Sequence, residues 1–243
     1  THWVGGMGVL VFIMALLSNV SDRSIHIMKA EMPGPIVGKL VPRVKDTAKI
    51  LYLIYIVLTA IQVVLLMCGK MSLFEALVHA FGTAGTGGFG ITAKSVGAYS
   101  PYIQWVIAIF MIIFAINFNL FYLLLIKRFK SVAKSAELWT YLAIVLVSIS
   151  IITIDLRSYY AISDAIRHAT FQVSSIISTT GYSTVDFNMW PTVSKEILLV
   201  LMLVGGCAGS TAGGLKVSRI VIMFEMAKKE LTHLLHPRAV SSV

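Results

Sequence analysis

The stretch Ser178-Thr179-Thr180-Gly181-Tyr182-Ser183-Thr184 is short, small and hydroxyl-rich, and it lies between two apolar segments. An upstream stretch, Gly85-Thr86-Gly87-Gly88-Phe89, has similar surroundings, with Gly88-Phe89 in the place of Gly181-Tyr182. Each copy follows an apolar span and a shorter run, and a turn and a second apolar span come after it. Such a stretch suits a backbone that turns its carbonyl oxygens toward a cation in place of water. We call residues 85–88 the first strip and residues 178–181 the second strip.

The composition places the chain in lipid. Of its 243 residues, 57% are apolar and only 13% are charged, whereas soluble domains average about 25% charged residues. The net charge of +9 comes mainly from Lys and Arg in residues 21–49, 127–137 and 216–243, while Asp and Glu are spread evenly. A Lys/Arg bias of this kind marks the cytoplasmic side of a membrane protein. We therefore interpret the charge as orientation in a lipid bilayer, and we expect no nucleic-acid partner.

The hydrophobic pattern predicts two successive units of the same plan. The predicted apolar spans are 2–18, 47–68, 102–126, 138–154 and 192–204, with a polar, proline-containing linker at 21–46. Two shorter helices, 72–83 and 160–177, precede the strips, and 72–83 is too short to cross a bilayer. Ser72 and Glu75 have the spacing of a capping box, and Ser163 or Asp164 could cap the second short helix. We expect the C-terminal ends of both short helices to face the pore axis, because the helix dipole favours a cation there.

The last span departs from this plan after residue 204. The ten residues from Gly205 to Gly214 include five glycines, each of which costs about 1 kcal/mol in a helix relative to alanine. We expect the helix to resume at Leu215 and to run to about Ala227. Non-helical backbone at membrane depth is tolerated where protein or a wet cavity covers it. The break is therefore predicted to face the ion path, with Ser210 and Thr211 offering oxygen atoms, and a simple packing kink is the alternative.

Few other residues suggest chemistry. Asn117 and Asn119 are polar groups in an apolar span, and such groups usually face the interior of a helix bundle. Two positions apart, they cannot share one helix face, so one could line the cavity while the other bonds a neighbouring helix. Cys207 is expected to pack as a small hydrophobic residue, since no base lies beside it in the sequence. We expect no enzymatic activity, because the sequence shows no acid–base or metal-binding constellation.

A family resemblance rests on several motifs taken together. HWVGGMGVLVF (2–12), EMPGP (31–35), TAGTGGFG (83–90), STTGYST (178–184), GGCAGSTAGGLKVSR (205–219) and HPRAV (236–240) resemble the membrane subunit of the Trk/Ktr/HKT potassium transporters. The form GGCAGSTAGGLK is most similar to the bacterial Trk type. The resemblance runs over nearly the whole chain.

The resemblance implies an all-α integral membrane fold of K⁺-channel-like helix–pore loop–helix repeats, fused and parallel around a central pore. Residues 1–46 would be the second helix of repeat one plus a cytoplasmic linker, 47–137 repeat two, and 138–243 repeat three with a cytoplasmic tail. We expect a fragment that lacks the first filter strip and the fourth repeat. Filter carbonyls would come from Gly85, Thr86, Gly87, Gly88, Ser178, Thr179, Thr180 and Gly181. An intramembrane gating loop would comprise Gly205, Gly206, Cys207, Ala208, Gly209, Ser210, Thr211, Ala212, Gly213, Gly214, Leu215 and Lys216.

The function that this resemblance implies is K⁺ uptake across the cell membrane, in bacteria the cytoplasmic (inner) membrane, with K⁺ as the transported ion and no organic cofactor. A homodimer and a cytosolic nucleotide-binding regulatory ring of the RCK type are the implied partners, with 21–49, 127–137 and 228–243 as docking segments. Alternatives are a Na⁺-permeable pore or a cation-coupled secondary transporter with broken helices. Inverted repeats would favour the transporter, whereas both complete repeats here are predicted to start and end inside.

Overall fold

The computed structural model describes residues 1–8 and 44–235. The regular secondary structure in these ranges is helical, as predicted for an all-α protein. The α-helices are α1 (His2–Gly6), α4 (Val44–Cys68), α5 (Leu73–Ala84), α6 (Pro101–Phe114), α7 (Phe118–Leu125), α8 (Phe129–Ala133), α9 (Ala136–Leu156), α10 (Ile162–Ile177), α11 (Thr192–Val204) and α12 (Val217–Leu235). Short 3-10 turns occupy Ser95–Ala98 and Phe187–Met189. Most of the predicted helix 2–18 and of the linker 21–46 lies outside the described residues.

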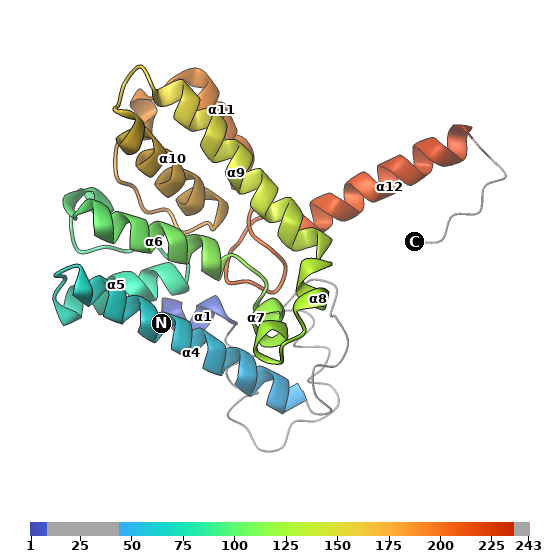
Figure 1. Ribbon diagram of the computed structural model, residues 1–243, viewed down its shortest axis with the longest axis horizontal. Helices are drawn as coiled ribbons and strands as arrows, with labels where there is room; N and C mark the ends of the chain where they lie inside the picture. The colour runs from blue at the N-terminus through green and yellow to red at the C-terminus, as the bar shows by residue number, and fades with distance from the viewer. Residues whose placement is uncertain (9–43, 236–243) are drawn as a thin grey trace.

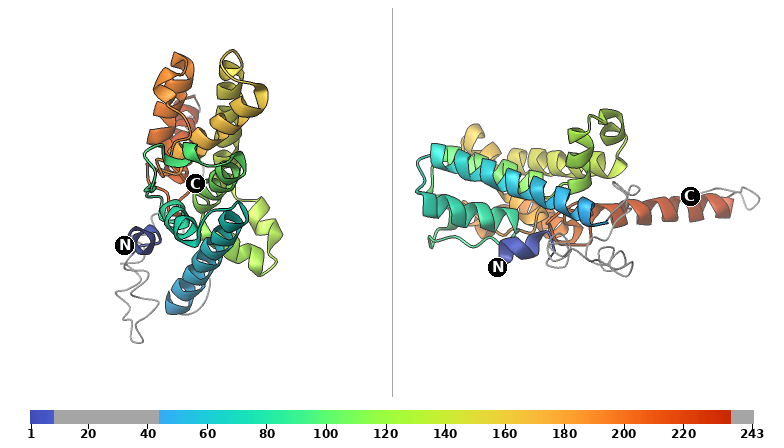
Figure 2. Two further views of the ribbon diagram at one scale, coloured as in Figure 1. Left: turned by 90° about the vertical axis from the view of Figure 1, so that its left-hand side faces the viewer. Right: turned by 90° about the horizontal axis from the view of Figure 1, so that it is seen from below.

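Each strip is preceded by a short helix that packs against three other helices. Helix α5 packs against α1, α4 and α6, and helix α10 packs against α6, α9 and α11, as Figures 1 and 2 show. Helix α5 has 12 residues and α10 has 16, which corresponds to about 18 and 24 Å of helix. Both are shorter than a hydrocarbon core of about 30 Å. Helix α6 touches both short helices and so joins the two units.

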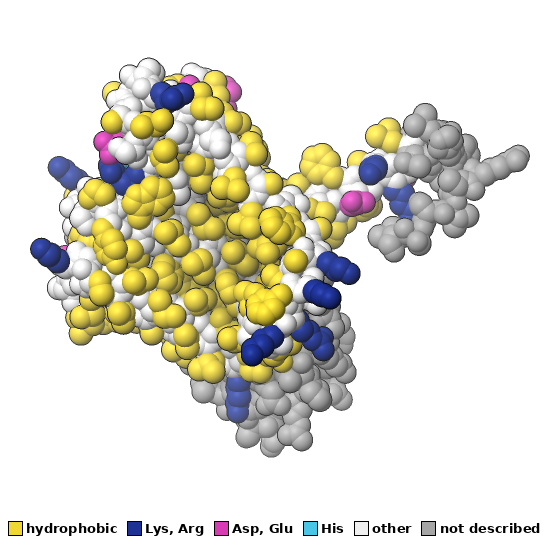
Figure 3. All heavy atoms as spheres, viewed as in Figure 1, with side chains coloured by type: hydrophobic (Ala, Val, Ile, Leu, Met, Phe, Trp, Pro, Cys, Tyr) yellow, Lys and Arg dark blue, Asp and Glu magenta, His cyan; other side chains and the backbone are white. Residues whose placement is uncertain are grey.

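Among the described residues, two helices are long and apolar enough to cross a membrane, Ala48–Cys68 and Ala136–Leu156, and α6 with α7 makes a third if the bent pair is one span. Apolar side chains cover most of the face seen in Figure 3. Large exposed apolar residues include Leu53, Val64, Leu146, Ile154 and Leu203. Exposed apolar surface on this scale is unusual for a soluble monomer. The chain thus has the surface of an integral membrane protein.

The described buried residues form two apolar clusters, the first mainly around α4, α5 and α6 but including Phe171 and Tyr182, and the second mainly around α9, α10 and α11. The first includes the rings of Tyr55, Phe114 and Phe118, and the centroid of Tyr55 lies 5.8 and 5.9 Å from the other two in edge-on contacts. The second includes Tyr141 and Trp190, among α9, α10 and α11. Edge-on aromatic pairs add to the energy of area burial. Apolar side chains are therefore packed beside both strips.

The predicted span over 102–126 is not one continuous helix. Helix α6 ends at Phe114, α7 begins at Phe118, and their axes differ by 91°. Asn117 is the N-cap of α7, and its side-chain oxygen accepts a hydrogen bond from the Asn119 backbone N–H at 2.9 Å. An asparagine cap starts a new helix because it satisfies a backbone donor that the preceding helix cannot.

Two helix boundaries also differ from the predictions. Ala161 is the N-cap of α10 and makes no side-chain capping bond. Asp164 instead pairs with Arg167, with 2.8 Å between Oδ1 and Nη1. After the glycine-rich segment the helix resumes at Val217 rather than Leu215, and it runs to Leu235 rather than Ala227. Helix α12 projects away from the rest of the molecule (Figure 1).

The capping box at α5 is confirmed, with the Glu75 carboxylate accepting from the Ser72 N–H at 3.0 Å.

Candidate functional site

The two strips have the same backbone conformation at equivalent positions. Thr86 and Thr179 have φ of 54° and 58°, and two residues later Gly88 and Gly181 have φ of 66° and 88°. The left-handed region is open to glycine but is rare for a β-branched residue. The sequence repeat is therefore also a repeat of backbone geometry.

The amide groups of each strip turn back toward the helix that precedes it. Gly87 and Gly88 both donate to the carbonyl of Gly82, at 2.7 and 3.4 Å. Thr180 and Gly181 both donate to the carbonyl of Ser175, at 2.9 and 3.3 Å. Each strip is thereby fixed to the C-terminal turn of its own helix, where the helix dipole is negative.

The carbonyl groups are left over by this arrangement. Within the described part of the chain, no hydrogen bond reaches the main-chain oxygens of residues 86–88 or of residues 179–181. Backbone carbonyls with no donor in the protein are the groups that can replace the hydration shell of an alkali cation. Both strips meet the chemical requirement of a filter wall.

The strips lie against each other, as the sequence repeat requires. A Cβ atom on Gly88 would collide with the carbonyl oxygen of Thr180 and would lie 3.2 Å from the carbonyl carbon of Gly181. The Tyr182 hydroxyl donates to the carbonyl of Phe89 at 3.0 Å. No heavy atom lies within 4 Å of a Cβ built on Gly181, so its side faces open space. Gly88 needs both its conformation and its missing side chain, and Gly181 needs its conformation.

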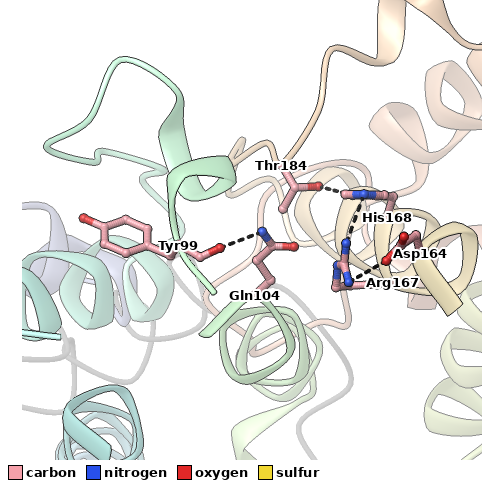
Figure 4. A network of polar contacts seen from close by, with 6 residues as sticks. All are labelled: Tyr99, Gln104, Asp164, Arg167, His168 and Thr184. Carbon is pink, nitrogen blue, oxygen red and sulfur yellow. Dashed lines mark hydrogen bonds and ion pairs between the residues drawn. The ribbon is translucent and has the colours of Figure 1, made fainter. Parts of the chain in front are cut away.

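Figure 4 shows polar contacts at Thr184, which follows the second strip, and a separate contact between Gln104 and Tyr99. His168 Nδ1 lies 2.9 Å from the hydroxyl of Thr184, and its Nε2 lies 3.4 Å from Arg167 Nη2. Arg167 is paired with Asp164, and Gln104 donates to the carbonyl of Tyr99 at 3.0 Å. The arginine charge near the strip is thus held by a carboxylate.

The glycine-rich segment 205–216, which we call the gating loop, has no helical structure between α11 and α12. Cys207 N–H donates to the carbonyl of Ala115 at 2.9 Å, and the Thr211 hydroxyl donates to that of Phe114 at 3.1 Å. Ala208 N–H donates to the Glu137 carboxylate at 2.6 Å. The loop is anchored on two carbonyls at the α6–α7 break that have no partner within a helix, and on the first turn of α9. Buried Cys207 packs in the second apolar cluster.

Two cavities lie next to the gating loop, and Gly5, Gly6 and Thr211 border both. The larger is about 510 Å³ and is lined by Thr1, His2, Gly5, Gly6, Gly85, Thr86, Thr179, Thr211 and Gly213. The smaller is about 280 Å³ and is lined by Gly5, Gly6, Met7, Gly8, Gly209, Ser210, Thr211, Ala212 and Lys216. The loop therefore forms part of the wall of a space beside the strips and part of the wall of a second, neighbouring space.

The two asparagines have different positions from those expected of one continuous helix. Asn117 is buried at the α6–α7 break, and its Oδ1 would lie 3.0 Å from a Cβ on Gly209 of the gating loop. Asn119 is half-buried in the first turn of α7. The break between α6 and α7 was not predicted from the sequence, and neither was the hydrogen bond by which Glu137 anchors the loop. An asparagine in the middle of an apolar run, read as a helix cap, could have indicated the break.

Comparison with known proteins gives the family. The sequence matches the model of the TrkH family, described as a cation transport protein, over residues 1–153 and 135–243. The chain belongs to the TrkH family. Its match extends over the two strips and the gating loop, so the resemblance inferred from the motifs is confirmed.

Relatives in the TrkH family include the Trk system potassium uptake protein TrkH of Escherichia coli K12, 38% identical over all of this chain and 51% of the relative. TrkG of the same strain is 33% identical over all of this chain and 51% of its own length. The crystal structure of the potassium transporter TrkH from Vibrio parahaemolyticus superimposes with a TM-score of 0.83 at 33% identity, over all of this chain and 50% of that one. The chain spans about half the length of these relatives.

Proposed function

We propose that this chain forms part of a K⁺ uptake pathway, in which the two strips contribute two walls of a selectivity filter. The unpaired carbonyl oxygens of residues 86–88 and 179–181 carry the proposal. They follow the C-terminal ends of two short helices, where the electrostatic potential favours a cation. The related TrkH and TrkG proteins are named for potassium uptake, which makes K⁺ the transported ion we propose here.

The gating loop is the proposed barrier of this pathway. Its place in the walls of both cavities supports the assignment, since residues within 209–213 line the space beside the strips and the neighbouring space. Glycine-rich backbone anchored by a few hydrogen bonds can move at a smaller energetic cost than a packed helix. The asparagines are secondary in this proposal: Asn117 supports the loop, and Asn119 continues α7.

The remaining assignments follow from family membership. Residues 1–46, 47–137 and 138–243 would be the end of one repeat and two complete repeats. We propose a homodimer in the cytoplasmic membrane of a bacterium, with a nucleotide-binding ring of the RCK type on the cytosolic side. The exposed basic residues Lys127, Arg128, Lys130 and Lys134 support the placement of that side, as basic residues favour it.

Alanine at the strip glycines tests the filter in the full-length protein that contains this chain. Gly181→Ala introduces only the strain of a left-handed alanine, and Gly88→Ala adds a collision with the Thr180 carbonyl. A left-handed non-glycine residue costs about 1–2 kcal/mol, so we expect roughly a tenfold loss of K⁺ over Na⁺ selectivity in Gly181→Ala and a larger loss in Gly88→Ala. Ion flux into proteoliposomes measures both.

Gly90→Ala is the matched control, because Gly90 has no left-handed φ and its Cβ would meet only His79 Nε2 and Tyr182 within ordinary contact distance, at 3.4 and 3.8 Å. We expect it to keep the selectivity of the unmodified protein. Unchanged selectivity in both strip variants would remove the two glycines from the filter.

A further inference from the structure

Two threonines at equivalent places in the two strips both contact the gating loop. The Thr86 hydroxyl donates to the carbonyl of Thr211 at 3.0 Å. The Thr179 hydroxyl accepts from the N–H of Gly213 at 2.7 Å. The strips and the loop lie far apart in the sequence, so these contacts join two features that the proposed function treats separately.

The hydrogen-bond inventory of a hydroxyl fits both contacts. Thr179 donates its single proton to the carbonyl of Ser178 at 2.7 Å, which leaves an oxygen lone pair for Gly213 N–H. Thr86 divides its proton between the carbonyl of Gly85 at 2.8 Å and that of Thr211 at 3.0 Å. A hydroxyl can serve as one donor and two acceptors.

The backbone of both threonines is in an unfavourable conformation. A β-branched residue with φ near +55° is a genuine outlier, and glycine at the same place would be unstrained. Thr86 and Thr179 nevertheless occupy it in both strips, with φ of 54° and 58°. Strain at a matched pair of positions is informative when the side chains make contacts that glycine could not. Here those contacts are made to the loop.

These contacts hold one part of the loop. Residues 207 and 208 are anchored on Ala115 and Glu137, away from the strips. Residues 211 and 213 face the strips, and a Cβ on Gly213 would lie 3.0 Å from the Thr179 hydroxyl. The segment 211–213 cannot leave its position beside the strips without breaking both threonine contacts.

We propose that Thr86 and Thr179 latch the gating loop to the filter strips, so that opening of the loop and the state of the filter are coupled. This inference rests on the proposed function, because it takes the strips as filter and the loop as gate. The coupling is reciprocal by thermodynamic linkage. If closing the loop changes the affinity of the strips for an ion, a bound ion changes the open–closed equilibrium of the loop by the same factor. The threonines are positioning residues for the loop, separate from the carbonyls proposed to bind the ion.

Valine in place of each threonine removes the hydroxyl and keeps the shape, whereas serine keeps the hydroxyl. One hydrogen bond contributes about 0.5–1.5 kcal/mol, so we expect Thr86→Val and Thr179→Val each to raise K⁺ flux roughly two- to tenfold in proteoliposomes of the full-length protein. Thr86→Ser and Thr179→Ser should return the flux toward that of the unmodified protein. Ser150→Ala, which removes an exposed hydroxyl bonded to Leu146, is the control and should leave flux unchanged.

A second background tests whether the threonines act through the loop. Deletion of residues 207–213, which removes the two loop partners Thr211 and Gly213, should raise flux by itself, and the valine substitutions should then add nothing. Amide hydrogen exchange of the loop, followed by mass spectrometry, should rise in both valine variants of the intact protein. This readout does not depend on transport and would also reveal a misfolded variant.

The outcomes separate the two proposals. If the deletion does not raise flux, the loop is not a gate and the proposed function fails. If the deletion raises flux while both valine variants match the unmodified protein in flux and exchange, the latch is refuted and the gate stands. Valine variants that change flux by the same factor with and without the loop would also refute the latch, since the threonines would then act on the filter alone.

Discussion

At the scale of single residues, the capping box that begins α5 carries a pH dependence. The backbone N–H and the hydroxyl of Ser72 donate to the Glu75 carboxylate, and these bonds hold the pKa of Glu75 below its usual range. A lowered folded-state pKa means that the charged form stabilises the fold above the unfolded value of about 4.5. That stability is lost as the pH falls through the lowered pKa.

Glu75→Gln removes this dependence and keeps the capping geometry, because glutamine also serves in a capping box. We expect the unmodified protein to have the higher Tm at pH 7 and the difference to shrink toward zero as the pH falls below 4.5. Thermal unfolding of the detergent-solubilised protein measures it, with Glu225→Gln on the exposed side of α12 as control. A Tm difference that stays constant with pH would contradict the assignment.

The residues at the two short helices show where sequence reasoning succeeds and fails. The box of Ser72 and Glu75 was predicted because its two partners lie three positions apart on the chain. Capping by Ser163 or Asp164 was predicted from residue type and is wrong, because α10 already begins at Ile162, and Asp164 pairs with Arg167 instead. The choice between cap and ion pair depends on three-dimensional neighbours.

At the scale of elements, the break between α6 and α7 supports the gating loop. The carbonyls of Phe114 and Ala115 are free of helical partners at the break, and the loop uses both. Residues 102–126 are apolar almost throughout, so periodicity alone predicts one helix. Periodicity could not predict the break, because the hydrogen bonds that stabilise the break come from residues 205–216.

The cap of α7 gives this break a test. Asn117→Ala removes the acceptor for the Asn119 N–H, and loss of an N-cap costs about 0.5–2 kcal/mol. We expect a lower Tm in Asn117→Ala than in the unmodified protein, and a Tm between the two in Asn117→Ser, which keeps a capping oxygen. Equal Tm values for alanine and serine would show that the side-chain cap does not stabilise the break.

At the scale of the whole molecule, the spans near 47–68 and 138–154, the two strips and the break in the last span were predicted from the sequence. They depend on composition over ten or more residues, which survives small errors in helix boundaries. Family membership confirms the broad plan, and the TM-score of 0.83 to a solved TrkH extends it to the arrangement of the helices. The hydroxyl contacts between strips and loop were outside the reach of sequence patterns, since each joins residues that are distant along the chain.

The predicted orientation across the membrane can be measured with single cysteines. Starting from Cys68→Ser and Cys207→Ala, we expect Lys94→Cys to react with an impermeant thiol reagent from the outside and Lys130→Cys only after permeabilisation. Both lysines are exposed, and the basic segment 127–137 marks the inner side by the Lys/Arg bias. Labelling of both from the same side would refute the orientation.

The backbone acceptors that hold the two strips, in the last turns of α5 and α10, bear on how the proposed filter would capture a cation. Because Gly82 and Ser175 each hold two successive amides of their own strip, the main chain keeps its curvature through internal bonds and does not depend on an occupant. A receptor whose shape is set in advance loses little free energy to ordering when it captures its guest. A transporter built on such strips would therefore keep its affinity for cations at low concentration. A filter backbone that loses its shape without an ion would first have to be ordered again, at a cost in free energy.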